Sequence, residues 1–204
     1  MKKLIAFLLT LCLLPVFASA EMTGSDYSVA LEGASFTFVP PQELVCMTRE
    51  SSASVFGRVG LSQRDVVPSM EALHVYALLT DETISVEIQL IAVPTEDGDY
   101  IALKADEAES TRAGFAHYYQ TFGFDVQSCE VYDVSGGHRF IRTAMSAPLE
   151  DGTPDYSVEY LTCHGGYALS ITLYTYESAP TQEQLALCDA LADSLRITAD
   201  VTGE

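Results

Sequence analysis

The chain has 204 residues, of which 29 are acidic and 10 are basic, so its formal net charge at pH 7 is −19. A field of this sign repels the phosphates of nucleic acids and anionic membrane surfaces, because binding to them depends on lysine and arginine side chains. The composition therefore argues against nucleic acid as a partner and is compatible with cationic partners. The length suits one domain with a substantial core.

The first twenty residues have the pattern of a secretory signal peptide. A basic start at Lys2-Lys3 precedes an apolar run over 4–17, and Ala18-Ser19-Ala20 forms a small-residue cleavage site. The apolar run is shorter than the roughly 20 residues that a membrane-spanning helix needs. We therefore expect cleavage after residue 20, which leaves a single mature domain over 21–204. This domain would have no membrane span and would lie in the cell envelope or outside the cell, so it would be extracytoplasmic.

The N-terminal half of the mature chain predicts two short strands, a helix and a hairpin. Alternating residues predict strands over 28–31 and 35–39. Apolar residues at helical spacing predict a helix that begins at Ser62, whose side chain can cap it. Next, strands over 75–79 and 84–93 form a predicted hairpin. The second of these alternates apolar and polar residues, which is typical of a strand with one buried and one wet face.

A second helix is expected from Asp106, which with Glu109 resembles a capping box, to a stop at Gly123. Its predicted apolar face consists of Ala108, Phe115, Tyr119 and Phe122. Acidic residues in its first turn suit the helix dipole. The pattern therefore predicts an amphipathic helix packed on a sheet.

The C-terminal half predicts four antiparallel strands and a closing helix. The strands are expected over 126–134, 138–147, 156–164 and 167–176. Gly-Gly pairs link the first to the second and the third to the fourth, and such links favour tight hairpins because the turns need positive φ. The last helix begins at Thr181, where Thr181-x-x-Gln184 is a capping box.

This order of elements resembles the PsbP/Mog1-like family. The resemblance rests on the F-x-F-x-P pattern of Phe36, Phe38 and Pro40, on the final hairpin "GGYALSITLYTY" and on the closing helix "LADSLRI". It implies an α+β fold with an antiparallel β-sheet flanked by helices, an α/β/α sandwich. The family includes photosystem accessory subunits, a nuclear transport cofactor and bacterial exported proteins, so the fold does not assign a function. The element order corresponds best to an exported bacterial branch of the family.

Cys163 and His164 are neighbours in a predicted strand, so their side chains point to opposite faces and cannot act as nucleophile and base for each other. If the predicted strands 138–147 and 156–164 are joined by a turn centred near Asp151, His138 lies opposite His164 at the end of the sheet. Two histidines there could bind a metal, with Asp133 or Tyr167 nearby. A histidine beside a glycine turn is more commonly only the polar cap of a hairpin.

Four cysteines follow the expected cleavage site: Cys46, Cys129, Cys163 and Cys188. The sequence does not decide whether these cysteines form two disulfides or remain free thiols. An even number of cysteines suits disulfides in an exported chain, but a buried free cysteine also behaves as a small apolar residue. Cys163 with Cys188 is one candidate pair, since Cys188 would lie on the buried face of the last helix. Cys129 or Cys46 could instead pair with Cys163.

The chain contains no G-x-S-x-G, P-loop, H-E-x-x-H or G-x-G-x-x-G motif. Tyr118-Tyr119 and Tyr174 with Tyr176 either line a carbohydrate or peptide surface or pack in the core. We therefore expect a non-enzymatic binding or accessory module without a cofactor, whose partner is an unknown protein or small molecule. The alternative is a secreted hydrolase or metal-dependent enzyme that uses His138 and His164.

Overall fold

The computed structural model describes residues 26–135, 137–149, 152–176 and 178–199. The signal peptide expected over 1–20 lies outside the described residues. In the described part of the chain, no helix is long and apolar enough to cross a membrane.

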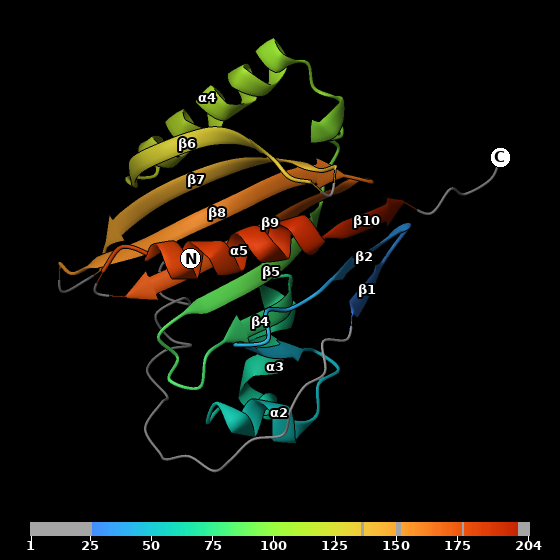
Figure 1. The fold of residues 1–204 in the computed structure, drawn as a ribbon, viewed down its shortest axis with the longest axis vertical. Coiled ribbons are helices and arrows are strands. Elements are labelled where there is room, and N and C mark those ends of the chain that lie inside the picture. Colours follow the sequence, from blue (N-terminus) through green and yellow to red (C-terminus); the bar gives the residue numbers. More distant parts are fainter. Residues whose placement is uncertain (1–25, 136, 150–151, 177, 200–204) are drawn as a thin grey trace.

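The centre of the molecule is a seven-stranded antiparallel sheet with the strand order β3-β4-β5-β9-β8-β7-β6 (Figure 1). Its strands in chain order are β3 (Val45–Thr48), β4 (Val75–Thr80), β5 (Glu87–Pro94), β6 (Asp125–Asp133), β7 (Arg139–Pro148), β8 (Pro154–His164) and β9 (Tyr167–Tyr176). A second, three-stranded sheet has the order β1-β2-β10. Its strands are β1 (Tyr27–Leu31), β2 (Ala34–Phe38) and β10 (Arg196–Ala199).

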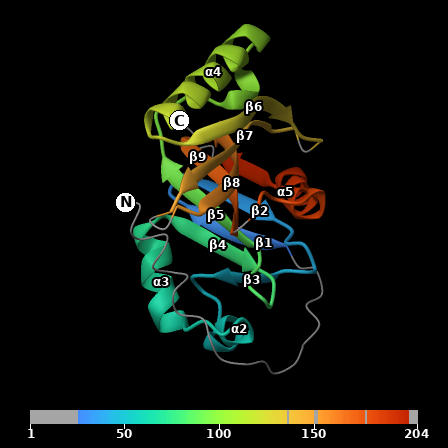
Figure 2. The same ribbon diagram turned by 90° about the vertical axis from the view of Figure 1, so that its left-hand side faces the viewer.

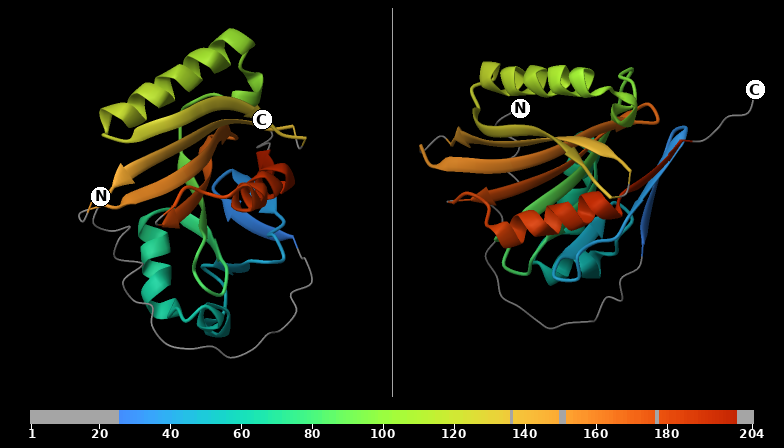
Figure 3. Two further views of the ribbon diagram at one scale, coloured as in Figure 1. Left: turned by 60° about the vertical axis from the view of Figure 1, so that its left-hand side comes forward. Right: turned by 45° about the horizontal axis from the view of Figure 1, so that its top comes forward.

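Helices cover both faces of the seven-stranded sheet. Helix α5 (Gln182–Ser194) packs on one face against β9 and also contacts β2 of the small sheet. On the other face, α2 (Ala53–Arg58) and α3 (Gln63–Ala72) pack at the β3 end, and α4 (Ala105–Thr121) packs at the β6 end. Figure 2 shows α3 and α4 on the side of the sheet away from α5, and the views in Figure 3 agree. The expected α/β/α arrangement is confirmed.

Three apolar clusters hold these layers together. The largest lies between the main sheet, the small sheet and α5, and includes Phe36, Phe38, Leu173 and Leu191. A second cluster lies under α2 and α3, and a third lies where α4 and the short 3-10 helix η1 (Tyr100–Ala102) meet β7 and β8. Because the clusters lie on both faces, the central strands are buried on each side.

The predicted Gly165-Gly166 turn and the final capping box are confirmed. Gly166 has φ +80°, a left-handed conformation that glycine adopts without a steric penalty, and it lies in the turn between β8 and β9. At the start of α5, the Gln184 amide donates to Thr181 Oγ1 at 3.2 Å and the Thr181 amide donates to Gln184 Oε1 at 2.8 Å. Local sequence therefore determines both features.

Other elements differ from the sequence prediction. The strands β3 and β10 and the helix α2 were not predicted, because each is only four to six residues long and none has a clear periodic pattern. The capping box of α4 uses Glu107 rather than the predicted Glu109. The Lys104 amide donates a hydrogen bond to Glu107 Oε2 at 2.8 Å. The predicted apolar face of α4 was wrong at Phe122, whose ring is 56% exposed and packs against the exposed Tyr118.

Candidate functional site

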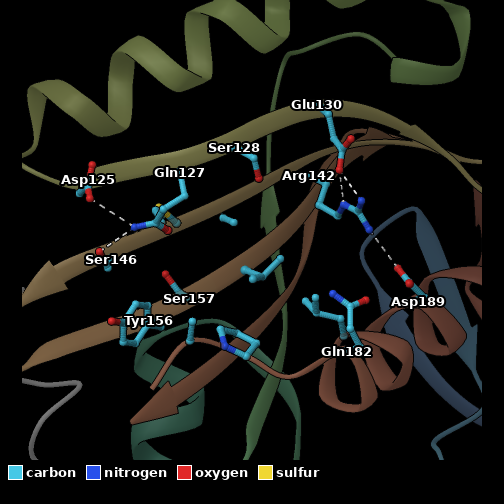
Figure 4. A pocket seen from close by; sticks show the side chains of 16 residues that line it. Asp125, Gln127, Ser128, Glu130, Arg142, Ser146, Tyr156, Ser157, Gln182 and Asp189 are labelled. Atoms are coloured by element: carbon cyan, nitrogen blue, oxygen red, sulfur yellow. Dashed lines mark hydrogen bonds and ion pairs between the residues drawn. The ribbon is translucent and has the colours of Figure 1, made fainter. Parts of the chain in front are cut away.

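A groove runs between α5 and the outer strands of the main sheet, with a volume of about 560 Å³ (Figure 4). This is within the range of roughly 300–1,000 Å³ that is typical of ligand sites. We call it the α5 groove, and it is lined by Asp125, Gln127, Ser128, Glu130, Arg142, Ala144, Met145, Ser146, Tyr156, Ser157, Val158, Ala179, Pro180, Gln182, Leu185 and Asp189. The groove is therefore large enough for a specific ligand.

Strand pairing explains why side chains that are distant in sequence line one groove. Ser146 on β7 lies opposite Tyr156 on β8, and Ala144 lies opposite Val158. Because directly paired residues of antiparallel strands point to the same face, these pairs form the floor of the groove. Gln182, Leu185 and Asp189 recur at intervals of three and four residues along α5 and form the opposite wall.

One end of the groove is closed by a charged cluster around Arg142. Its Nε donates to Glu130 Oε1 at 2.7 Å, and its Nη1 lies 3.4 Å from Asp189 Oδ1. The guanidinium also stacks over the Tyr132 ring, with Cζ 4.4 Å from the ring centroid. A guanidinium that is shared between two carboxylates and an aromatic ring is held in a fixed position.

Tyr160 extends this cluster into the core. Its side chain is fully buried, and its hydroxyl donates to Asp189 Oδ1 at 2.8 Å. Burial is the main cause that raises the pKa of Tyr160, so the phenol stays protonated and remains a donor. Arg142 and Tyr160 together therefore fix the Asp189 carboxylate at the wall of the groove.

The other end of the groove is formed by exposed polar groups. The Gln127 amide nitrogen donates to Ser146 Oγ at 2.8 Å and lies 3.5 Å from Asp125 Oδ2. Figure 4 shows Asp125 and Ser146 at one end of the lining residues and Arg142 with Asp189 at the other. Between the two ends the lining includes the apolar side chains Ala144, Val158 and Leu185.

The charges of the groove are unequal. Asp125, Glu130 and Asp189 supply three carboxylates, whereas Arg142 is the single basic residue among the described residues that line it. Since Arg142 is already paired with two of these carboxylates, it has little capacity left for an anionic ligand. The arrangement is suited to a ligand with polar or cationic groups at its ends and apolar groups between them.

The structure brings together the two histidines singled out from the sequence. Ile141 pairs with Leu161, and the same register places His138 opposite His164, with ring centroids 5.6 Å apart. His164 Nδ1 lies 3.0 Å from Asp99 Oδ2. Burial is the main cause that lowers the pKa of His138, and the neighbouring His164 and Arg196 act in the same direction.

The two further ligands considered with these histidines are engaged elsewhere. Asp133 accepts a hydrogen bond from Arg139 Nε at 2.7 Å, and the Tyr167 hydroxyl donates to the Glu32 carbonyl at 3.0 Å. Within the ranges that the structure describes, no group of three or more His, Cys, Asp or Glu side chains is placed to hold a metal ion. Metal binding by the histidine pair stays a prediction.

The suggested disulfide between Cys163 and Cys188 is not formed. All four cysteines of the described chain are free thiols. Cys163 belongs to the apolar cluster under α4 and η1, whereas Cys188 belongs to the cluster under α5 on the opposite face of the sheet. The sheet separates the two thiols, because α5 packs on the face to which Cys163 does not point.

The sequence analysis did not identify the residues of the α5 groove. Arg142, Glu130 and Asp189 come from three elements, and no motif links them. One signal was present, since Arg142 stands between Ile141 and Thr143 in a strand of a chain with few basic residues. A charged residue in a central position of a predicted strand calls for a charged partner.

Comparison with known proteins gives matches among solved structures. No protein-family model and no curated protein sequence matches the chain. The solution structure of cyanobacterial PsbP (CyanoP) from Synechocystis sp. PCC 6803 matches over 90% of this chain and 98% of that chain, with 11% identity and a TM-score of 0.46. A crystal structure from Bacteroides thetaiotaomicron VPI-5482 matches over 83% of this chain and 46% of that chain, with 10% identity and a TM-score of 0.46. Both TM-scores are below 0.5, so neither match assigns this chain to a family.

Proposed function

We propose that this protein is an exported, non-enzymatic binding module that holds an extended polypeptide segment with basic side chains in the α5 groove. The observation that carries the proposal is the groove itself, with carboxylates at both ends and apolar side chains between them. The signal-peptide pattern over 1–20 supports export. The lack of a catalytic motif in the sequence supports a binding role.

The dimensions of the groove suit an extended chain. Asp125 and Glu130 on β6 pair with Ser146 and Arg142, which lie four residues apart on β7, a distance of roughly 13 Å at about 3.3 Å per residue. An extended peptide of about five residues spans the same length. Its basic side chains would then lie near Asp125 at one end and near Glu130 and Asp189 at the other.

The charge of the whole molecule supports a cationic partner. A net charge of −19 attracts basic segments at long range, and this attraction weakens as salt screens it. Arg142 offers little to an acidic side chain, because its guanidinium is already paired with Glu130 and Asp189. We therefore expect basic peptides to bind and acidic ones not to bind.

Calorimetric titration of the mature chain tests the proposal. The probe is acetyl-Lys-Ala-Lys-Ala-Lys-amide, and the comparison peptide has glutamate in place of lysine. Ser128 is exposed and lines the groove, so Ser128→Trp should fill it and abolish binding. Ala72→Trp, at an exposed position of α3, is the matched control and should bind as the wild type does.

Equal binding of both peptides, or binding that survives Ser128→Trp, would contradict the proposal. We expect the affinity for the lysine peptide to fall between 50 and about 300 mM salt, since exposed charges interact over a Debye length of about 10 Å at 0.1 M. An affinity that does not depend on salt would also contradict it.

A further inference from the structure

Arg142 places a basic side chain inside an acidic groove. It is the single basic residue among the described residues that line the α5 groove, whose carboxylates are those of Asp125, Glu130 and Asp189. Its side chain is 26% exposed, compared with 49% for Glu130 and 36% for Asp189. The arginine is therefore the most enclosed member of the charged cluster (Figure 4).

The contacts of Arg142 are those of a bound guanidinium ligand. Its Nε and Nη2 both donate to Glu130 Oε1, and its Nη1 donates to Asp189 Oδ1 at 3.4 Å. The guanidinium carbon lies 4.4 Å from the centroid of the Tyr132 ring and 5.7 Å from that of the Tyr160 ring. Two carboxylates and two aromatic rings thus converge on one cation, a combination that suits a guanidinium or an ammonium group.

The fold positions these four partners without help from the arginine. Glu130 and Tyr132 are two residues apart on β6, so their side chains point to the same face. Tyr160 is fully buried directly opposite Arg142, and its hydroxyl donates to Asp189 Oδ1 at 2.8 Å. A cation site would therefore persist at this end of the groove if the guanidinium moved away.

A ligand cation can replace the guanidinium at a modest cost. The ion pairs of Arg142 are partly exposed, and ion pairs in contact with water contribute little free energy. However, Arg142 is tethered beside the site, which gives it a high effective concentration there. A single free basic group competes poorly with a tethered one. A peptide that is already anchored at Asp125 competes well, because its next basic side chain is then tethered too.

We propose that Arg142 is an internal competitor that occupies the cation site of the α5 groove and limits its affinity for basic side chains. A peptide lysine or arginine reaches Glu130 and Asp189 by displacing the Arg142 guanidinium. The groove consequently selects segments with several basic residues over segments with one. This proposal rests on the peptide-binding function of the groove and adds how that site is regulated.

Arg142→Met tests the proposal, because methionine keeps an unbranched side chain and removes the charge. Calorimetric titration with acetyl-Lys-Ala-Lys-Ala-Lys-amide should show roughly three- to tenfold tighter binding than in the wild type, as expected when two partly exposed ion pairs no longer compete. Arg64→Met, at an exposed position of α3, is the matched control. It removes the same charge far from the groove and should bind the peptide as the wild type does.

Arg142→Lys decides the question if circular dichroism shows that Arg142→Met does not fold. Lysine keeps the charge but lacks the planar fork of donors, so it competes less well and the peptide should bind more tightly than in the wild type. Peptide binding by the wild type without a gain in the folded Arg142 variant, or an equal gain in Arg64→Met, would overturn this proposal alone. No peptide binding by either the wild type or the Arg142 variant would overturn the proposed function and this proposal with it.

Discussion

Glu87→Gln should stabilise the protein at neutral and alkaline pH and have little effect in acid. Glu87 lies on the central strand β5, is 7% exposed, and has its pKa raised mainly by burial. A carboxyl group whose pKa is higher in the folded state stabilises the fold below its unfolded pKa. This stabilisation is lost as the pH rises through the folded pKa. Glutamine stays neutral throughout, so the variant avoids that loss.

The size of the effect follows from the cost of a buried charge. Each unit of pKa difference corresponds to about 1.4 kcal/mol, and the charge of Glu87 is opposed by burial with no described salt bridge to offset it. We expect a gain of roughly 1 to 2 kcal/mol at pH 8 and close to none at pH 4. For a domain of this size such a gain raises the melting temperature by about 2 to 8 °C.

Thermal melts followed by circular dichroism at pH 4, 6 and 8 measure this difference. The exposed Glu71→Gln on α3 is the control and should show no comparable gain at pH 8. The hydrogen bond from Gln89 is retained, because glutamine at position 87 also offers an oxygen acceptor. A variant that is no more stable than the wild type at pH 8, or a gain of the same size at pH 4, would refute the reasoning.

Three other measurements check the structure. Thr181→Ala removes the cap of α5 and should cost about 1 kcal/mol in unfolding free energy, measured by urea titration; no loss would contradict the capping geometry. Leu191→Ala opens a cavity at a fully buried position and should cost roughly 2 to 5 kcal/mol in the same assay; a cost below 1 kcal/mol would contradict its placement in the core. Thiol titration of the unfolded, unreduced mature chain should find four free thiols, whereas two or none would show that disulfides form.

The hairpins and the final helix could be predicted because their signals are local. The Gly165-Gly166 pair fixes the turn between β8 and β9, and the symmetric pairing of β7 with β8 is enough to place His138 opposite His164. The threonine at position 181 and its glutamine partner mark the start of α5. Each of these features depends on residues that are close in sequence.

The candidate sites could not be predicted in the same way. To predict the α5 groove, one must know that Asp189 on α5 lies beside Arg142 on β7, although the two residues are 47 positions apart in the sequence. Placing Glu87 and Glu159 on the same face of the sheet requires knowing the order of β5, β9 and β8, because the two residues come from distant segments. The wrong pairing of Cys163 with Cys188 has the same cause, since the sequence did not show which face of the sheet α5 covers.

The alternative of a metal-dependent enzyme is tested by elemental analysis together with His138→Ala and His164→Ala. Under the binding account, the purified protein contains no stoichiometric zinc, copper or calcium, and the double variant binds the lysine peptide as the wild type does. Stoichiometric metal that is lost in the double variant would instead support the alternative, because the two rings lie 5.6 Å apart and could share an ion.

Intermolecular NOEs between the lysine peptide and the mature chain test the central claim most directly. The peptide methylene protons should give NOEs to the methyl groups of Ala144, Val158 and Leu185, which lie between the charged ends of the α5 groove. NOEs confined to methyl groups under α2 and α3, such as those of Val67 and Leu73, would place the peptide on the other face. That result would contradict the proposed function.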